Sequence, residues 1–285
     1  MPSLIDIRRR IRSVKNTQQI TKAMKMVSTA RLRRAQERVI NARPFSRMAG
    51  EILRSVAAAA SGAESVREHP LLQPREENNV QLVIVSADRG LAGGFNTNLI
   101  KAAQQFIAER PDQKIELELL GRKARDFFTR RPVQVSGELT GVSLTAGLPE
   151  ATALAEKLTS RITAGETDAV YILYNEFKSI LTQKITIRRV LPVEVQAGPQ
   201  RDYIFEQPPA EMLARLLPKY VLLQVLEAFL ESAAAEHAAR MTAMDAATTN
   251  ANDVINKLTL YMNRVRQASI TREIIEVVSG ASALE

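Results

Sequence analysis

The chain of 285 residues contains no cysteine, no tryptophan and only two histidines. Without cysteine it has no disulfide, no thiolate metal site and no thiol nucleophile. His69 and His237 stand isolated from each other, which argues against a histidine metal cluster and a Ser-His-Asp triad. The composition therefore argues against metal sites built from cysteine or histidine and against thiol or Ser-His-Asp catalysis. For His237, which lies beside alanines at helical spacing, we expect a capping or surface role.

Long hydrophobic runs are also missing. The most apolar stretch, 220–230, is interrupted by Gln224 and Glu227. It falls well short of the roughly 20 apolar residues that a membrane-spanning helix needs. We therefore expect no direct membrane span. The 45% hydrophobic and 25% charged content is typical of a soluble folded protein.

Acidic side chains are scarce in one part of the chain. Residues 1–54 carry fourteen basic and three acidic side chains, a balance of +11, while the whole chain has +8. This excess implies a partner with an acidic surface, either nucleic acid or protein. Phe45 is the one aromatic residue of 1–54, so a set of rings for base stacking is missing and acidic protein is favoured. A transit peptide has a similar composition, but the apolar stripe described below continues far beyond a cleavable segment.

The C-terminal part predicts a long helix of a coiled coil. Apolar or small residues alternate at spacings of three and four, at Met241, Met244, Thr248, Ala251, Ile255, Leu258, Met262 and Val265. No proline or glycine interrupts 219–278. Beyond Val265 the same register would place Ser269, Arg272 and Glu276 on the seam, so the pairing must shift or end there.

The N-terminal part, from residue 4 to about 58, predicts a second long helix. Its apolar stripe comprises Leu4, Ile7, Ile11, Val14, Ile20, Met24, Val27, Leu32, Ala35 and Val39. The stripe slips between blocks, which predicts local changes of register, and Pro44 should kink or divide the helix. Two rods of similar length at opposite ends of one chain most simply form an antiparallel coiled coil. We expect residues 1–60 to pair with 209–285.

Between the rods, residues 61–208 predict a Rossmann-like, mostly parallel α/β domain, because strands alternate with helices. We expect strands over 80–85, 115–120, 133–135, 168–174 and 182–190, with an edge strand over 201–205. Helices are expected over 97–109, 122–129 and 149–163. Pro208 and Pro209 should begin the last helical part, and Pro218 should end or kink its first helix.

The turn SADRGLAGGFN (86–96) lies where phosphate-binding loops occur, after a buried strand and before a helix. Its glycines match neither GxGxxG nor GxxxxGK[ST]. A tight turn that needs positive φ is the simpler interpretation, and a nucleotide-binding α/β enzyme is the alternative. We expect Asp88 and Arg89 to form a local ion pair or a subunit contact.

Four blocks resemble the γ subunit of F-type ATP synthases. They are NTQQITKAMKMVSTARL (16–32), SADRGLAGGFN (86–96), EHAARMTAMDAATTNANDVINKLTLYMNRVRQASIT (236–271), and the C-terminal ITRE and GASA segments with Glu276. They keep the order of that family and extend from end to end. The chain has Ala92 where many members have cysteine, so no thiol function is implied.

The resemblance implies a non-catalytic rotor shaft inside a hexamer of α and β subunits, with the ε subunit and the membrane c-ring at its foot. It implies no catalytic residue, no metal and no cofactor in the chain itself. The shaft would couple transmembrane proton flow to ATP synthesis and hydrolysis and help to regulate ATPase activity, on the cytoplasmic side of a bacterial membrane. It also implies that Met24, Arg240, Gln267 and Thr271 contact a β subunit. From the residues alone, a basic coiled-coil protein that binds nucleic acid remains the alternative.

Overall fold

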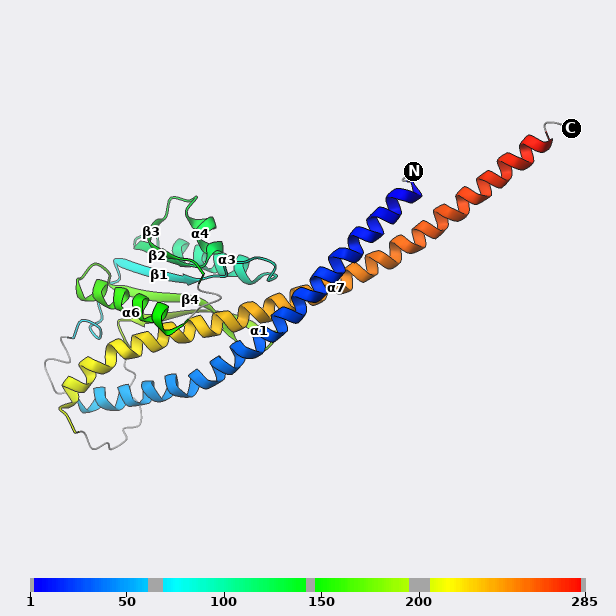
Figure 1. Cartoon of the computed structure of the whole chain (residues 1–285). Helices are drawn as coiled ribbons and strands as arrows, with labels where there is room; N and C mark the ends of the chain where they lie inside the picture. The colour runs from blue at the N-terminus through cyan, green and yellow to red at the C-terminus, as the bar shows by residue number, and fades with distance from the viewer. Residues whose placement is uncertain (1–2, 61–68, 142–146, 195–205, 283–285) are drawn as a thin grey trace. The chain divides into compact units, whose positions relative to one another are not determined.

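The computed structural model describes residues 3–60, 69–141, 147–194 and 206–282. Two helices dominate it, α1 (Leu4–Ala59) with 56 residues and α7 (Pro209–Ser282) with 74 residues (Figure 1). The chain forms two compact units, one made of 1–28 and 241–285 and the other of 29–240. No helix among the described residues is long and apolar enough to cross a membrane.

The first unit is an antiparallel pair of helices, as predicted from the two long helical segments at opposite ends of the chain. Gln18 bonds Asn252 at 3.4 Å, the Thr21 and Thr248 hydroxyls lie 2.8 Å apart, and Lys25 pairs with Asp245 at 2.6 Å. Residue numbers thus fall along α7 as they rise along α1. All eight seam residues predicted on α7 are buried or half-buried, and every residue of 270–279 is exposed.

The register of α1 differs from the prediction, because the seam does not slip. Ile20 and Val27, which were expected on the seam, are 60% and 52% exposed. The buried positions are Thr21 at 8% and Ser28 at 3% exposure, which continue the spacing set by Ile7, Ile11 and Val14. Polar residues fill the seam because they find partners across it, as Thr21 does with Thr248.

Neither proline ends a helix, so of the two predicted outcomes, a break or a kink, the break does not occur. Helix α1 continues through Pro44 and α7 through Pro218. Both prolines are exposed, so water can satisfy the carbonyl that each leaves without an amide partner. Packing on either side of each proline offsets its cost, about 3 kcal/mol.

The second unit contains a five-stranded sheet of order β3-β2-β1-β4-β5. Its strands are β1 (Asn79–Val85), β2 (Lys114–Leu120), β3 (Gln134–Leu139), β4 (Ala169–Phe177) and β5 (Gln183–Leu191). The first four are parallel, and β5 runs antiparallel to β4 at an edge. The mostly parallel α/β fold is confirmed, with β3 lying later than the predicted 133–135. The predicted strand at 201–205 lies outside the described residues.

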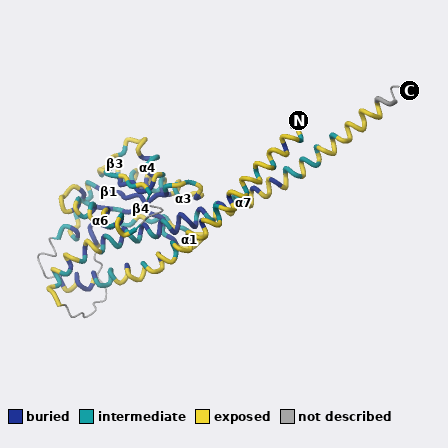
Figure 2. The backbone as a smooth tube through the Cα atoms, viewed as in Figure 1, coloured by how far each residue is buried: buried dark blue, intermediate teal, exposed yellow. Residues whose placement is uncertain are grey.

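Helices cover both faces of this sheet (Figure 1). On one face, α3 (Phe95–Ala108) and α4 (Arg122–Phe128) pack on Leu82, Ile84 and other residues of the same alternating set. On the other face, Val83 and Val85 pack with α6 (Leu148–Thr163), the end of α1 and the beginning of α7. Burial is concentrated in these layers, as Figure 2 shows. Successive side chains along a strand point to opposite faces of the sheet. Both sets are apolar here, so helices can pack on both faces.

One buried carboxylate joins three elements of the second unit. Glu231 of α7, with 3% of its side chain exposed, accepts from Arg43 Nε at 2.8 Å and Arg43 Nη2 at 3.1 Å. It also accepts from the Phe177 amide of β4 at 2.9 Å, while Arg43 Nη2 donates to the Phe177 carbonyl at 2.7 Å. Helix α1, helix α7 and the end of β4 are therefore held together by one charge-assisted network.

His237 is buried, so the expectation of a surface or capping role is wrong. It is 6% exposed and its Nδ1 has no hydrogen-bond partner among the described residues. Burial, together with the positive charges of Arg240 and Arg31, lowers the pKa of His237 to about 4. The small alanines beside it in the sequence leave room for the ring to be buried in its neutral form.

Replacing Glu231 tests the three-way network. In Glu231→Ala, the Phe177 amide loses its acceptor and Arg43 its carboxylate, so we expect a loss of about 2–3 kcal/mol in the free energy of unfolding. Urea unfolding of the full chain measures this. The exposed Glu156 of α6 provides the control, and a Glu156→Ala variant should change stability by less than about 0.5 kcal/mol. Equal losses in both variants would contradict the network's role.

His237 should make stability depend on pH. Its folded pKa lies below the unfolded value of about 6.5, so its contribution is complete above pH 6.5 and is lost as pH falls toward 4. Between pH 7 and pH 5 we expect a loss of about 2 kcal/mol that His237→Leu abolishes, measured by urea unfolding at each pH. His69→Leu should retain most of that loss. An unchanged pH dependence in His237→Leu would refute the assignment.

Candidate partner-contact site

Two of the predicted contact residues lie together at the exposed end of α7. Gln267 and Thr271 are four residues apart, so they occupy the same face, and both are exposed. The Thr271 hydroxyl donates to the backbone carbonyl of Gln267 at 2.9 Å, and the side chain of Gln267 is exposed to a partner. Around them lie the exposed apolar side chains of Ile270, Ile274, Ile275, Val277 and Val278.

The end of this pairing follows from the register. Because Gln18 faces Asn252, moving fourteen residues along both helices places Leu4 opposite residue 266. Helix α1 begins at Leu4, so α7 has no more of α1 beside it beyond that point. The five apolar side chains are exposed for this reason, and such a surface is typical of a protein contact.

Met24 lies in the same unit but beside the seam. It is half-buried, and its neighbours Thr21 and Lys25 make the contacts across to α7. Exposed Met26 and Val27 follow it on α1, at 60% and 52%. Met24 therefore contributes a partly exposed apolar surface on the basic helix.

Arg240 lies in the second unit, where it holds the turn 86–96. It is 7% exposed and donates to Glu236 Oε1 at 2.6 Å. It also donates to the carbonyls of Arg89 at 3.3 Å and Gly90 at 3.4 Å. Arg240 therefore has hydrogen-bond partners within its own chain. The sequence-based prediction of a β contact did not include them. The spacing of four between Glu236 and Arg240 is the signal that could have revealed this pair.

The turn itself has the geometry of a tight connection. Leu91 and Gly93 have φ of 63° and 55°, so positive φ occurs at one glycine as expected and also at a leucine. Asp88 Oδ1 accepts the amides of Arg122 at 3.1 Å and Gly141 at 3.0 Å instead of forming the expected ion pair with Arg89. The Ala87 amide donates to Asn96 Oδ1 at 3.0 Å. These bonds fasten the turn to its own domain.

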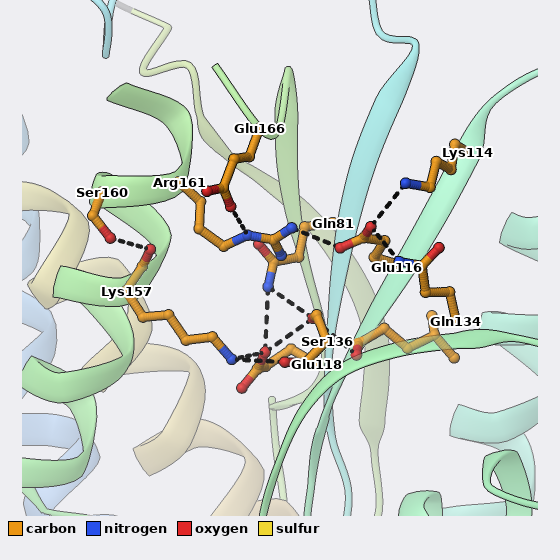
Figure 3. A network of polar contacts seen from close by, with 11 residues as sticks. Gln81, Lys114, Glu116, Glu118, Gln134, Ser136, Lys157, Ser160, Arg161 and Glu166 are labelled. Atoms are coloured by element: carbon orange, nitrogen blue, oxygen red, sulfur yellow. Dashed lines mark hydrogen bonds and ion pairs between the residues drawn. The ribbon is translucent and has the colours of Figure 1, made fainter. Parts of the chain in front are cut away.

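A network of polar contacts joins α6 to the sheet (Figure 3), although Gln81 Oε1 and Arg161 Nη1 are buried without a hydrogen-bond partner among the described residues. Glu118, 5% exposed, accepts from Lys157 Nζ at 2.6 Å, Ser136 Oγ at 3.1 Å and Gln81 Nε2 at 3.3 Å. Nearby, Arg161 pairs with Glu116 and lowers the pKa of that carboxyl against the effect of its burial. This network fixes α6 on the sheet, and no group of metal-ligating side chains occurs in the described parts of the chain.

Sequence reasoning missed the residues that join distant elements. Arg43, Glu231, Glu118 and Lys157 carry no local motif, because their partners lie far away in the sequence. Among the described residues, the buried ion pairs stabilise the fold. The exposed apolar end of α7 is a surface suited to binding another protein.

The comparisons with known proteins agree with this. The model of the family described as ATP synthase matches residues 3–284. Curated relatives named ATP synthase gamma chain cover the whole of both chains, at 61% identity in Solibacter usitatus and 46% in Anaeromyxobacter sp. (strain Fw109-5). A chain from a Euglena gracilis mitochondrial ATP synthase structure, entitled OSCP/F1/c-ring, has the same fold at 19% identity, with a TM-score of 0.67 over 99% of this chain and 94% of that one. The chain belongs to the ATP synthase gamma chain family.

Proposed function

We propose that the chain is the central rotor shaft of an F-type ATP synthase. It couples proton flow through a membrane c-ring to ATP synthesis and hydrolysis at β subunits, and it is itself non-catalytic. The observation that carries this is the full-length likeness to gamma chains, joined to an antiparallel helix pair with an exposed apolar end. The alternative of a nucleic-acid-binding protein has no support among the relatives.

The partners follow from this role. One structural neighbour is entitled central stalk and c-ring of the Tetrahymena thermophila mitochondrial ATP synthase, at a TM-score of 0.61, and another names F1 and the c-ring. The α and β subunits surround the shaft, and the ε subunit and c-ring bind at its foot. We place the chain as a peripheral protein on the cytoplasmic side of a bacterial membrane.

For the β contact we propose Met24, Arg240, Gln267 and Thr271. The exposed amide of Gln267 and the neighbouring Thr271 support direct hydrogen bonds to a β loop. Arg240 would contact β by exchanging hydrogen-bond acceptors. Its bonds to the Arg89 and Gly90 carbonyls are long, at 3.3 and 3.4 Å, and are therefore the ones it can give up. It can exchange these acceptors for one on β while keeping Glu236.

Reconstitution with α and β subunits tests the role. The wild-type chain should form a stable complex and change the ATPase activity of the hexamer. An absence of both effects would refute the rotor function.

In the complete membrane-bound enzyme, Gln267→Ala and Arg240→Ala should each impair coupled turnover. A lost hydrogen bond to a charged group costs about 1.5–3 kcal/mol, which corresponds to roughly a tenfold effect or more. ATP synthesis by the complete enzyme in vesicles measures this, and circular dichroism checks the fold. Ser269→Ala, on the other side of α7, is the control and should leave synthesis near the wild-type rate. Normal synthesis in both test variants would refute the proposed contacts.

A further inference from the structure

A cavity of about 450 Å³ lies between α1, β5 and the beginning of α7, within the unit 29–240. Its lining includes five arginines and two glutamates, namely Arg43, Arg47, Arg54, Arg188, Arg189, Glu194 and Glu227. The volume lies in the usual range for small-ligand sites, about 300–1,000 Å³. Such a density of guanidinium groups is typical of sites that recognise phosphate.

Three of these arginines already have carboxylate partners. Arg43 pairs with Glu231 at 2.8 Å, and Arg188 pairs with Glu227 at 3.3 Å. Arg189 pairs with Glu77 and Glu194, both at 3.2 Å, but its buried Nε has no hydrogen-bond partner among the described residues. These ion pairs form the walls of the cavity and hold the guanidinium groups in place.

Arg47 and Arg54 differ from the other three, because neither has a hydrogen bond or an ion pair within the described ranges. They are seven residues apart, so two turns of α1 place them on the same face, about 10 Å apart along the helix axis. Two unpaired guanidinium groups at this separation repel each other less when an anion lies between them. A diphosphate spans such a gap better than a single phosphate.

Gly50 lies between these two arginines on the same face of α1. A Cβ at this position would meet Tyr220 Cε2 at 3.7 Å and the Tyr220 hydroxyl at 4.0 Å, and no other neighbour within 4 Å is present among the described atoms. The position therefore has room for a methyl group in ordinary contact with Tyr220, and no larger side chain among the described residues stands between Arg47 and Arg54 on this face. The Tyr220 hydroxyl beside this position is a further donor, and burial raises the pKa of Tyr220, which keeps its proton.

We propose that this cavity binds a diphosphate-bearing anion, held by Arg47 and Arg54 with the Tyr220 hydroxyl and the free Nε of Arg189. The ligand is either a free diphosphate, as in pyrophosphate or a nucleoside diphosphate, or a lipid that carries two phosphates. This site is separate from the β contact and does not rest on the rotor function. Arg47 and Arg54 are part of the excess of basic side chains on α1, and the proposed ligand would neutralise their charge.

Titration of the full chain with inorganic pyrophosphate tests the proposal. Isothermal titration calorimetry should show one saturable site. Arg47→Gln and Arg54→Gln should each weaken binding roughly tenfold or more, because each removes charge-assisted hydrogen bonds. Gly50→Glu should abolish binding, because it places a carboxylate between Arg47 and Arg54 on the cavity side of α1.

Two control variants separate this site from the general charge of the helix. Arg38→Gln removes the same charge from an exposed position of α1 outside the cavity and should change affinity by less than about twofold. Gly50→Ala adds only the methyl group that the space accepts and should retain binding. Circular dichroism and thermal unfolding establish that each variant is folded.

Parallel titrations distinguish the two sources of the ligand. Tighter binding of ADP or pyrophosphate indicates a soluble ligand, and stronger flotation with phosphatidylcholine vesicles containing cardiolipin, lost in Arg47→Gln, indicates a lipid. The absence of saturable binding to any of these probes overturns the proposal. Equal weakening in Arg38→Gln and Arg47→Gln also overturns it, as does binding only to an acidic peptide.

Discussion

The structure depends on the pairing of two helices whose residues are far apart in the sequence. Each contact across the pair, such as Thr21 with Thr248 or Arg43 with Glu231, closes a loop of about two hundred residues, which carries an entropic cost. Burial of a continuous seam and the specific polar bonds across it offset that cost. The antiparallel direction then determines which residues meet in each unit.

The seam is only partly apolar, and this has consequences for how the shaft is stabilised. Thr21 and Ser28 are buried where leucine would give a tighter coiled coil, and Met244, Ala251 and Ile255 supply the buried apolar surface on α7. Polar pairs at a seam specify register, because a shift would leave their hydroxyl groups without partners. A slender helix pair with a defined register suits a shaft whose outer surface must contact other subunits.

Buried charge has a different role in the second unit. Glu231, Glu118 and Glu236 are almost fully buried, and each is matched by a basic side chain, Arg43, Lys157 or Arg240. These pairs fasten the helices and the glycine turn to the sheet. Arg47 and Arg54 stand apart from this pattern, since both line a cavity and neither has a carboxylate partner within the described ranges. This contrast points to a ligand at the cavity.

The sequence by itself determined the mostly parallel sheet, the two long helices and the heptad positions from Met241 to Val265. These features follow from the local spacing of apolar residues, which predicts a helix or a strand whatever the tertiary partner is. Only the tertiary structure decided that Thr21 and Ser28 occupy the seam instead of Ile20 and Val27, since the partner helix sets the register. It also decided that α1 and α7 continue through Pro44 and Pro218, because packing beyond each proline outweighs the lost hydrogen bond. The burial of His237 and Arg240 likewise depends on neighbours that no local pattern encodes.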